Sequence, residues 1–158
     1  MSSELEQDIS TFWSILFSII SDVEKRLADH MATHDLTPPQ FFVLKTLIEH
    51  NGQCPIGQIA REHHLTNATM TGLVKRLEAI ELVTRERSQE DGRSVIVILT
   101  NDGRARFDAV KDDVFAQLQV ILGLINTEER QALMHFLMRY LEVMNQLFPA
   151  DQVPSESE

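Results

Sequence analysis

The sequence predicts a mainly α-helical fold with a small β-hairpin wing: a winged helix-turn-helix flanked by long N- and C-terminal helices. The first observation is a pair of short helical segments joined by a turn between residues 56 and 82. Two runs of strand-forming residues, 82–87 and 94–99, follow directly and are separated by a turn sequence with Asp91-Gly92. The third observation is the recurrence of apolar residues at three- and four-residue steps near both chain ends.

The N-terminal part is predicted to begin with an amphipathic helix over residues 4–34. The apolar face of this helix is wider than one packing partner requires. Thr37 is expected to cap a second helix, with Pro38 at its first position, where a missing N–H costs little. That helix should end at the stop signal Asn51-Gly52.

Two further helices are predicted after the hairpin. Thr100 should cap the first, which runs to about Leu124, and either Asn126 or Thr127 should start the second. Their apolar stripes exceed what a small core needs, which suggests self-association into a homodimer. A two-fold dimer would place two copies of the helix-turn-helix one DNA turn apart, roughly 34 Å. The alternative is that the terminal helices pack only on each other within one subunit.

These features divide the chain into three parts. Residues 1–34 and 104–148 are assigned to a helical dimerisation region, and residues 35–103 to a winged helix-turn-helix DNA-binding domain, called the winged segment below. Residues 149–158 are polar and are expected to form a flexible tail.

The net charge of -10 counts against DNA binding, but the charge is unevenly distributed. Residues 61–106 hold eight Lys/Arg and seven Asp/Glu, whereas the rest of the chain holds six basic and seventeen acidic residues. Phosphate contacts depend on local charge, so the overall balance does not prevent them.

Composition also indicates the cellular compartment of the protein. The single cysteine, Cys54, excludes an intramolecular disulfide and fits a reducing cytosol. The most apolar run, residues 12–20, is too short to span a bilayer, which needs roughly 20 residues. The N-terminus is acidic where a signal peptide would be basic. We therefore expect a soluble cytoplasmic protein without membrane contact.

The second helix of the pair carries the predicted base-reading face. Met70 and Leu77 belong to its buried stripe, and the opposite face presents short polar and basic side chains. Asn67 can bond adenine bidentately, whereas a basic side chain such as Lys75 can hold a phosphate. The alternative is an ordinary solvated helix face. The residues predicted to contact DNA are Thr66, Asn67, Thr69, Thr71, Lys75, Arg76, Arg85, Arg87, Asp91 and Arg93.

The hairpin adds a minor-groove contact. Arg93 should project from the wing, where a narrow minor groove attracts an arginine. Asp91, two residues before it, could orient the guanidinium. The two residues could also simply close the wing on themselves, and both roles are compatible.

The run QIAREHHLTNATMTGLVKRLEAIELVTRERSQEDGRSVIVILTNDGR resembles the MarR family of bacterial transcription regulators. The family's wing signature, Asp-x-Arg followed by Leu-Thr-x-x-Gly, is matched by Asp91, Arg93, Leu99, Thr100 and Gly103. The helices before and after the run match too. The resemblance implies a homodimer held by the terminal helices, a wing arginine in the minor groove, and repression relieved by a small molecule or an oxidant.

Two residues depart from the family pattern. Glu81 stands where the family often has glycine, so a left-handed conformation there would cost about 1 kcal/mol. His64 stands where a small residue is common.

Three kinds of signal could act on such a regulator. Cys54 is expected to be a small buried residue, which disfavours thiol sensing. His30 and His34 have a spacing that places both rings on one helical face, but no metal ligand set is complete. The third kind, which the resemblance to the family implies, is a small aromatic, phenolic or anionic effector in an apolar cleft between the dimerisation helices and the DNA-reading segment. The candidate lining residues are Trp13, Phe17, His30, His34, Phe41 and Phe42, although Phe41 and Phe42 fit a core position better.

Together with the resemblance, the sequence predicts a sequence-specific DNA-binding transcriptional repressor that binds a pseudo-palindromic operator in double-stranded DNA as a homodimer and is released by a small-molecule ligand. No catalytic or cofactor-binding motif is present, so we expect neither an enzyme nor a cofactor. The alternatives are a winged helix used only to bind another protein, which the acidic charge would suit, and a thiol- or metal-responsive regulator.

Overall fold

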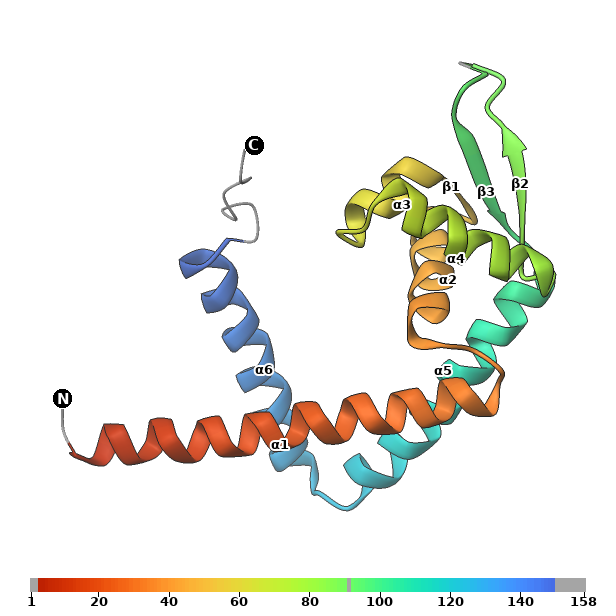
Figure 1. Cartoon of the computed structure of the whole chain (residues 1–158). Helices are drawn as coiled ribbons and strands as arrows, with labels where there is room; N and C mark the ends of the chain where they lie inside the picture. The colour runs from red at the N-terminus through yellow and green to blue at the C-terminus, as the bar shows by residue number, and fades with distance from the viewer. Residues whose placement is uncertain (1–2, 91, 150–158) are drawn as a thin grey trace. The chain divides into compact units, whose positions relative to one another are not determined.

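The computed structural model describes residues 3–90 and 92–149, and Figure 1 shows the elements of that part of the chain. They confirm the predicted fold class, which is mainly helical with a small β-sheet. The helices are α1 (Ser3–Thr33), α2 (Pro38–Glu49), α3 (Ile56–Glu62), α4 (Asn67–Ala79), α5 (Asn101–Gly123) and α6 (Thr127–Leu147). The strands are β1 (Gln53–Pro55), β2 (Val83–Arg87) and β3 (Val95–Leu99).

The predicted helix starts follow from local hydrogen bonds. The Thr37 hydroxyl accepts a bond from the Gln40 N–H, and the Gln40 side chain accepts one from the Thr37 N–H, so both donors at the start of α2 are satisfied. Asn126 and Glu129 form the same reciprocal pair at the start of α6. Asn126, rather than Thr127, is therefore the cap.

The sheet contains one strand that the sequence did not reveal. β1 pairs antiparallel with β3, so the strand order is β1-β3-β2, and the predicted hairpin is part of a three-stranded sheet. Cys54 lies opposite Val97 in this pairing, and both are buried. Three residues that end in proline carry no strand periodicity, because β1 exists only through its pairing with β3.

The core lies between α2, α3, α4 and the sheet. Phe41 of α2 stacks on Phe107 of α5 with ring centroids 4.8 Å apart, which ties the start of α5 to the winged segment. The buried apolar residues are Met31, Leu36, Phe41, Val43, Leu44, Leu47, Cys54, Ile59, Ala60, Met70, Val74, Leu77, Leu82, Val83, Val97 and Val110.

The chain divides into two compact units, residues 1–114 and residues 115–158, which are described separately. In the first unit, Met31 is the one fully buried residue of α1, whereas Trp13 is 65% exposed. In the second unit, Arg130 donates hydrogen bonds to the carbonyl oxygens of Leu122 and Ile125 and so closes the α5–α6 connection. The predicted dimerisation, winged and tail regions stay predictions, and residues 150–158 of the tail lie outside the described residues.

Within residues 3–90 and 92–149, no helix has the length and apolar character that crossing a membrane requires.

Candidate nucleic-acid interface

The start of α4 is an exposed hydrogen-bonding terminus. Thr66 caps the helix: its hydroxyl oxygen accepts a bond from the Thr69 N–H at 3.2 Å. The Thr66 and Thr69 hydroxyls also lie 2.9 Å apart and bond to each other. Both side chains and Asn67 are exposed, so this end of α4 presents polar groups to solvent.

The two faces of α4 separate as the periodicity predicted. Met70, Val74 and Leu77 are fully buried, and Leu73 packs partly against the same core. The opposite side carries Asn67, Lys75 and Arg76, all exposed. The core therefore fixes one face of α4 and leaves the polar face open.

Thr71 is more restrained than its neighbours on that polar face. It is half-buried, and its hydroxyl donates a hydrogen bond to the Asn67 carbonyl oxygen at 2.7 Å. Its oxygen lone pairs and methyl group are left to contact a base, since the donor is already used.

The β2–β3 hairpin projects beyond the helices of the winged segment, with α3 and α4 side by side at its base (Figure 1). Its turn is closed by hydrogen bonds from the Ser88 N–H to the Ser94 carbonyl and from the Gly92 N–H to the Ser88 carbonyl. Gly92, in the predicted turn, has φ +64°, a left-handed conformation that glycine adopts without strain.

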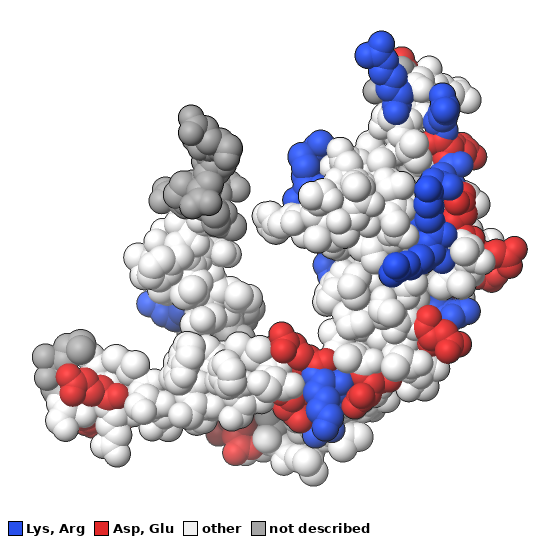
Figure 2. All heavy atoms as spheres, in the orientation of Figure 1, with Lys and Arg blue, Asp and Glu red and all other residues white. Residues whose placement is uncertain are grey.

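Basic residues gather on this hairpin. Figure 2 shows Lys and Arg over the end of the hairpin and along one side of the winged segment, interspersed with Asp and Glu. Arg87 and Arg93 are both exposed there. Asp91, the predicted partner of Arg93, lies outside the described residues.

Arg85 has a different environment from the other predicted contact residues. Its Nε donates a hydrogen bond to Oε2 of Glu78 at 2.9 Å, and its Nη2 lies 2.6 Å from the same oxygen. Sequence reasoning missed Glu78, because the two residues are seven apart and lie on different elements.

The short helix α3 is tied to α2 by two histidine contacts that the sequence did not reveal. His50 Nε2 lies 2.9 Å from Oε1 of Glu62, and His63 Nε2 lies 2.8 Å from the Thr46 hydroxyl. The pKa of Glu62 lies below its usual value. The larger cause is a hydrogen bond from the Gln58 side chain, and the contact with His50 is a smaller one. Polar contacts, as well as the apolar core, therefore hold α3 against α2.

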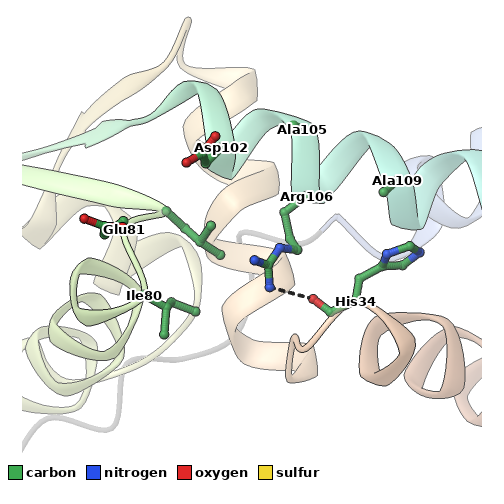
Figure 3. Close-up of a pocket in the computed structure, with 8 residues that line it drawn as sticks. His34, Ile80, Glu81, Asp102, Ala105, Arg106 and Ala109 are labelled. Carbon is green, nitrogen blue, oxygen red and sulfur yellow. Dashed lines mark hydrogen bonds between the residues drawn. The ribbon is translucent and has the colours of Figure 1, made fainter.

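A separate cavity of about 410 Å³ lies on one side of the first unit (Figure 3). Arg106 reaches across it and donates a hydrogen bond to the His34 carbonyl oxygen at 2.9 Å. The cavity is lined by His34, Ile80, Glu81, Leu82, Asp102, Ala105, Arg106 and Ala109.

Of the residues predicted to line an effector cleft, only His34 borders this cavity. Trp13 and Phe17 are exposed on α1, where their rings stack on each other at 6.1 Å. Phe41 is buried in the core, which is the position that the sequence favoured for it. Phe42 was expected in the core, but it is 41% exposed, because the next residue along a helix points about 100° away.

His30 and His34 do converge, but on a carboxylate. His34 Nε2 lies 2.7 Å and His30 Nδ1 lies 3.9 Å from Oδ2 of Asp113 on α5. Among the described residues, no group of three or more His, Cys, Asp or Glu side chains is arranged to hold a metal ion.

Cys54 is buried, as predicted, at 1% exposure. Burial, with a smaller contribution from the negative charge of Glu62, raises the pKa of its thiol. The reactive thiolate is therefore disfavoured at this position.

Comparisons with known proteins bear on the family and the fold. The family model described as "MarR family" matches residues 36–95. The organic hydroperoxide resistance transcriptional regulator of Bacillus subtilis (strain 168) is 30% identical over 134 residues, covering 84% of this chain and 88% of that protein.

Solved structures share the fold. A MarR family protein from Bacillus stearothermophilus superposes with a TM-score of 0.79 at 25% identity, covering 89% of this chain and 97% of the other. The F27L mutant of MepR from S. aureus, solved bound to an oligodeoxyribonucleotide, has a TM-score of 0.65 at 24% identity and covers 84% and 97%.

Proposed function

Because the chain belongs to the MarR family of DNA-binding transcription regulators, we propose that it is a repressor that binds a pseudo-palindromic operator as a homodimer and is released by a small-molecule ligand. The observation that carries this proposal is the pairing of two features on the winged segment. The open polar face of α4 has the size and chemistry of a major-groove reader, and the projecting hairpin carries exposed arginines.

Each proposed contact follows from its environment. Asn67 is exposed at the start of α4 and reads a base edge, and Thr71 offers its oxygen or methyl group beside it. The N-terminal hydroxyls of Thr66 and Thr69 approach a phosphate.

The basic residues are also divided between phosphate contacts and groove contacts. Lys75, Arg76 and Arg87 are exposed and neutralise phosphates, which fixes the register of the protein on the duplex. Arg93 at the wing enters the adjacent minor groove. Asp91 keeps its proposed role of orienting Arg93.

Exposed apolar side chains support the homodimer. Trp13 and Phe17 of α1 leave more than half of their surface open, and Ile9–Ser21 contains no charged residue. In the second unit, Phe136, Leu137 and Leu141 of α6 are also exposed. Contiguous apolar surface of this kind is typical of an interface between subunits.

The cavity beside Arg106 supports ligand control. It touches the turn that joins α4 to β2 through Ile80, Glu81 and Leu82, and it touches α5 through Asp102 and Arg106. A small aromatic or phenolic effector bound there would contact both α5 and the end of α4, which is the proposed recognition helix. Its binding could then change the spacing of two DNA-reading helices in a dimer.

The second candidate is a winged helix that binds only protein, and the net charge of -10 favours it. A salt titration of binding distinguishes the two. DNA from upstream of the protein's own gene should bind more tightly than random DNA, with affinity that falls steeply as salt rises. No preference at either low or moderate salt would favour the protein-interaction module.

A further inference from the structure

Arg85 is bound to the recognition helix rather than presented to solvent. Its Nε and Nη2 both contact Oε2 of Glu78, at 2.9 and 2.6 Å. Glu78 lies in the last turn of α4, and Arg85 lies in the middle of β2. The two side chains are 36% and 30% exposed, so the ion pair is partly shielded from water.

The sheet register explains why Arg85 meets α4. Arg85 lies opposite Val97 on β3, and Val83 lies two residues earlier on the same face of β2. Both valines are buried in the core that α4 helps to form. The stem of Arg85 therefore leaves the sheet on the α4 side, and its guanidinium reaches the end of the helix.

The connection between α4 and β2 is short and fixed at both ends. Glu81 has φ +62°, and its carbonyl oxygen accepts a hydrogen bond from the Thr100 hydroxyl at 2.8 Å. The Leu82 N–H bonds the Leu77 carbonyl oxygen. The Glu78–Arg85 pair is a side-chain bridge across this connection.

We propose that Arg85 is a positioning residue whose ion pair with Glu78 holds the β2–β3 hairpin at a fixed angle to α4. The helix can then lie in the major groove while Arg93 reaches the adjacent minor groove. This inference rests on the proposed placement of α4 and the wing on DNA. A guanidinium already neutralised by a carboxylate contributes little to a phosphate contact.

Removing the Glu78 carboxylate distinguishes the two roles of Arg85 by the sign of the effect. If Arg85 binds a phosphate, Glu78→Ala frees its guanidinium, removes a negative charge and strengthens DNA binding. If Arg85 positions the wing, the same change loosens the hairpin and weakens binding several-fold. Glu81→Ala is the matched control. It removes an equal charge three residues further along the chain, and the Glu81 carboxylate forms no ion pair within the described part of the chain.

The measurement is the affinity for a duplex that the wild-type protein has selected from a random-sequence pool, followed over a range of salt concentrations. Arg85→Gln should weaken binding without changing the salt slope, whereas loss of a phosphate contact lowers the slope by about 0.9. The charge swap Glu78→Arg with Arg85→Glu should recover affinity relative to either single reversal. Thermal unfolding checks that each variant is folded.

The outcomes separate this inference from the proposed function. If the wild-type protein selects no duplex, the proposed function itself fails. If it selects one and Glu78→Ala binds it as tightly as or more tightly than Glu81→Ala, the positioning role of Arg85 is overturned. A several-fold loss with Glu78→Ala, with an unchanged salt slope for Arg85→Gln, supports it, even if the swapped protein fails to fold.

Discussion

Gly103, in the first turn of α5, lies so close to the Leu82 carbonyl oxygen that a Cβ at this position would overlap it. The same carbonyl accepts a hydrogen bond from the Thr100 N–H at 3.1 Å. The start of α5 therefore packs backbone against backbone on the start of β2. Gly103, the glycine of the sequence motif Leu-Thr-x-x-Gly, thus has a steric function at the junction of α5 and the wing.

We expect Gly103→Ala to lower the free energy of unfolding by about 1–3 kcal/mol, because the added methyl group must push α5 away from β2. Urea unfolding followed by circular dichroism measures this change. Gly123→Ala, at the end of the same helix, is the control: beyond its chain neighbours and the adjacent helix backbone, no atom lies within 4 Å of its Cβ position. The free energy of unfolding of that variant should stay close to that of the wild type, because Gly123 is the last residue of α5 rather than an interior one. Equal stability of the two variants would refute the close approach.

Glu81→Gly should raise the free energy of unfolding by about 0.5–1 kcal/mol, because φ +62° is strained for a residue with a Cβ. Glu81→Ala removes the carboxylate and keeps the strained conformation, so it separates the backbone effect from the charge effect. Thermal unfolding of the three proteins should rank the glycine variant as the most stable. A glycine variant no more stable than wild type would show that the turn stores no strain.

Arg93→Ala should weaken operator binding while leaving thermal stability nearly unchanged, because the side chain is exposed on the projecting hairpin. Fluorescence anisotropy with a labelled operator duplex measures the affinity. Lys45→Ala on α2 serves as the control, since it removes an equal charge away from both the proposed DNA contacts and the proposed dimer-forming helices. Equal affinities for Arg93→Ala and wild type would remove Arg93 from the DNA site.

The Cys54 thiol should react slowly in the folded protein. Burial raises its pKa, so the thiolate fraction near neutral pH is smaller than for a free cysteine and grows only as the pH rises toward that higher value. Iodoacetamide should therefore label the native protein far more slowly than the urea-unfolded protein, as followed by mass spectrometry. An organic hydroperoxide should leave operator binding unchanged. Rapid native labelling, or loss of binding on oxidation, would restore the thiol-sensing alternative.

Much of the fold was predictable because its signals are local. The Thr37 and Asn126 caps depend on residues three apart, and the buried stripe of α4 repeats with the helical period. Glu81 and His64, noted as departures from the family pattern, adopt φ +62° and +53°. Their left-handed conformations are imposed by the surrounding turns rather than favoured by the residues themselves.

The parts that sequence reasoning missed depend on tertiary contacts. β1 is a strand only because Gln53–Pro55 pairs with β3. The Glu78–Arg85 pair and the His34–Asp113 contact join residues on different elements, so no spacing rule indicates them. Of the residues predicted for the effector cleft, only His34 borders the cavity beside Arg106, since a list of aromatic residues does not say which helix faces a cavity.

Two copies of the winged segment are proposed to read adjacent turns of one operator. A hydroxyl-radical footprint on the selected duplex measures where each copy contacts the DNA. We expect a two-fold symmetric footprint, with two protected half-sites whose centres are one DNA turn apart, roughly 34 Å, and minor-groove protection where Arg93 inserts. Arg93→Ala should lose the minor-groove part alone. A single asymmetric footprint, or protection without minor-groove contacts, would rule out this arrangement on the DNA.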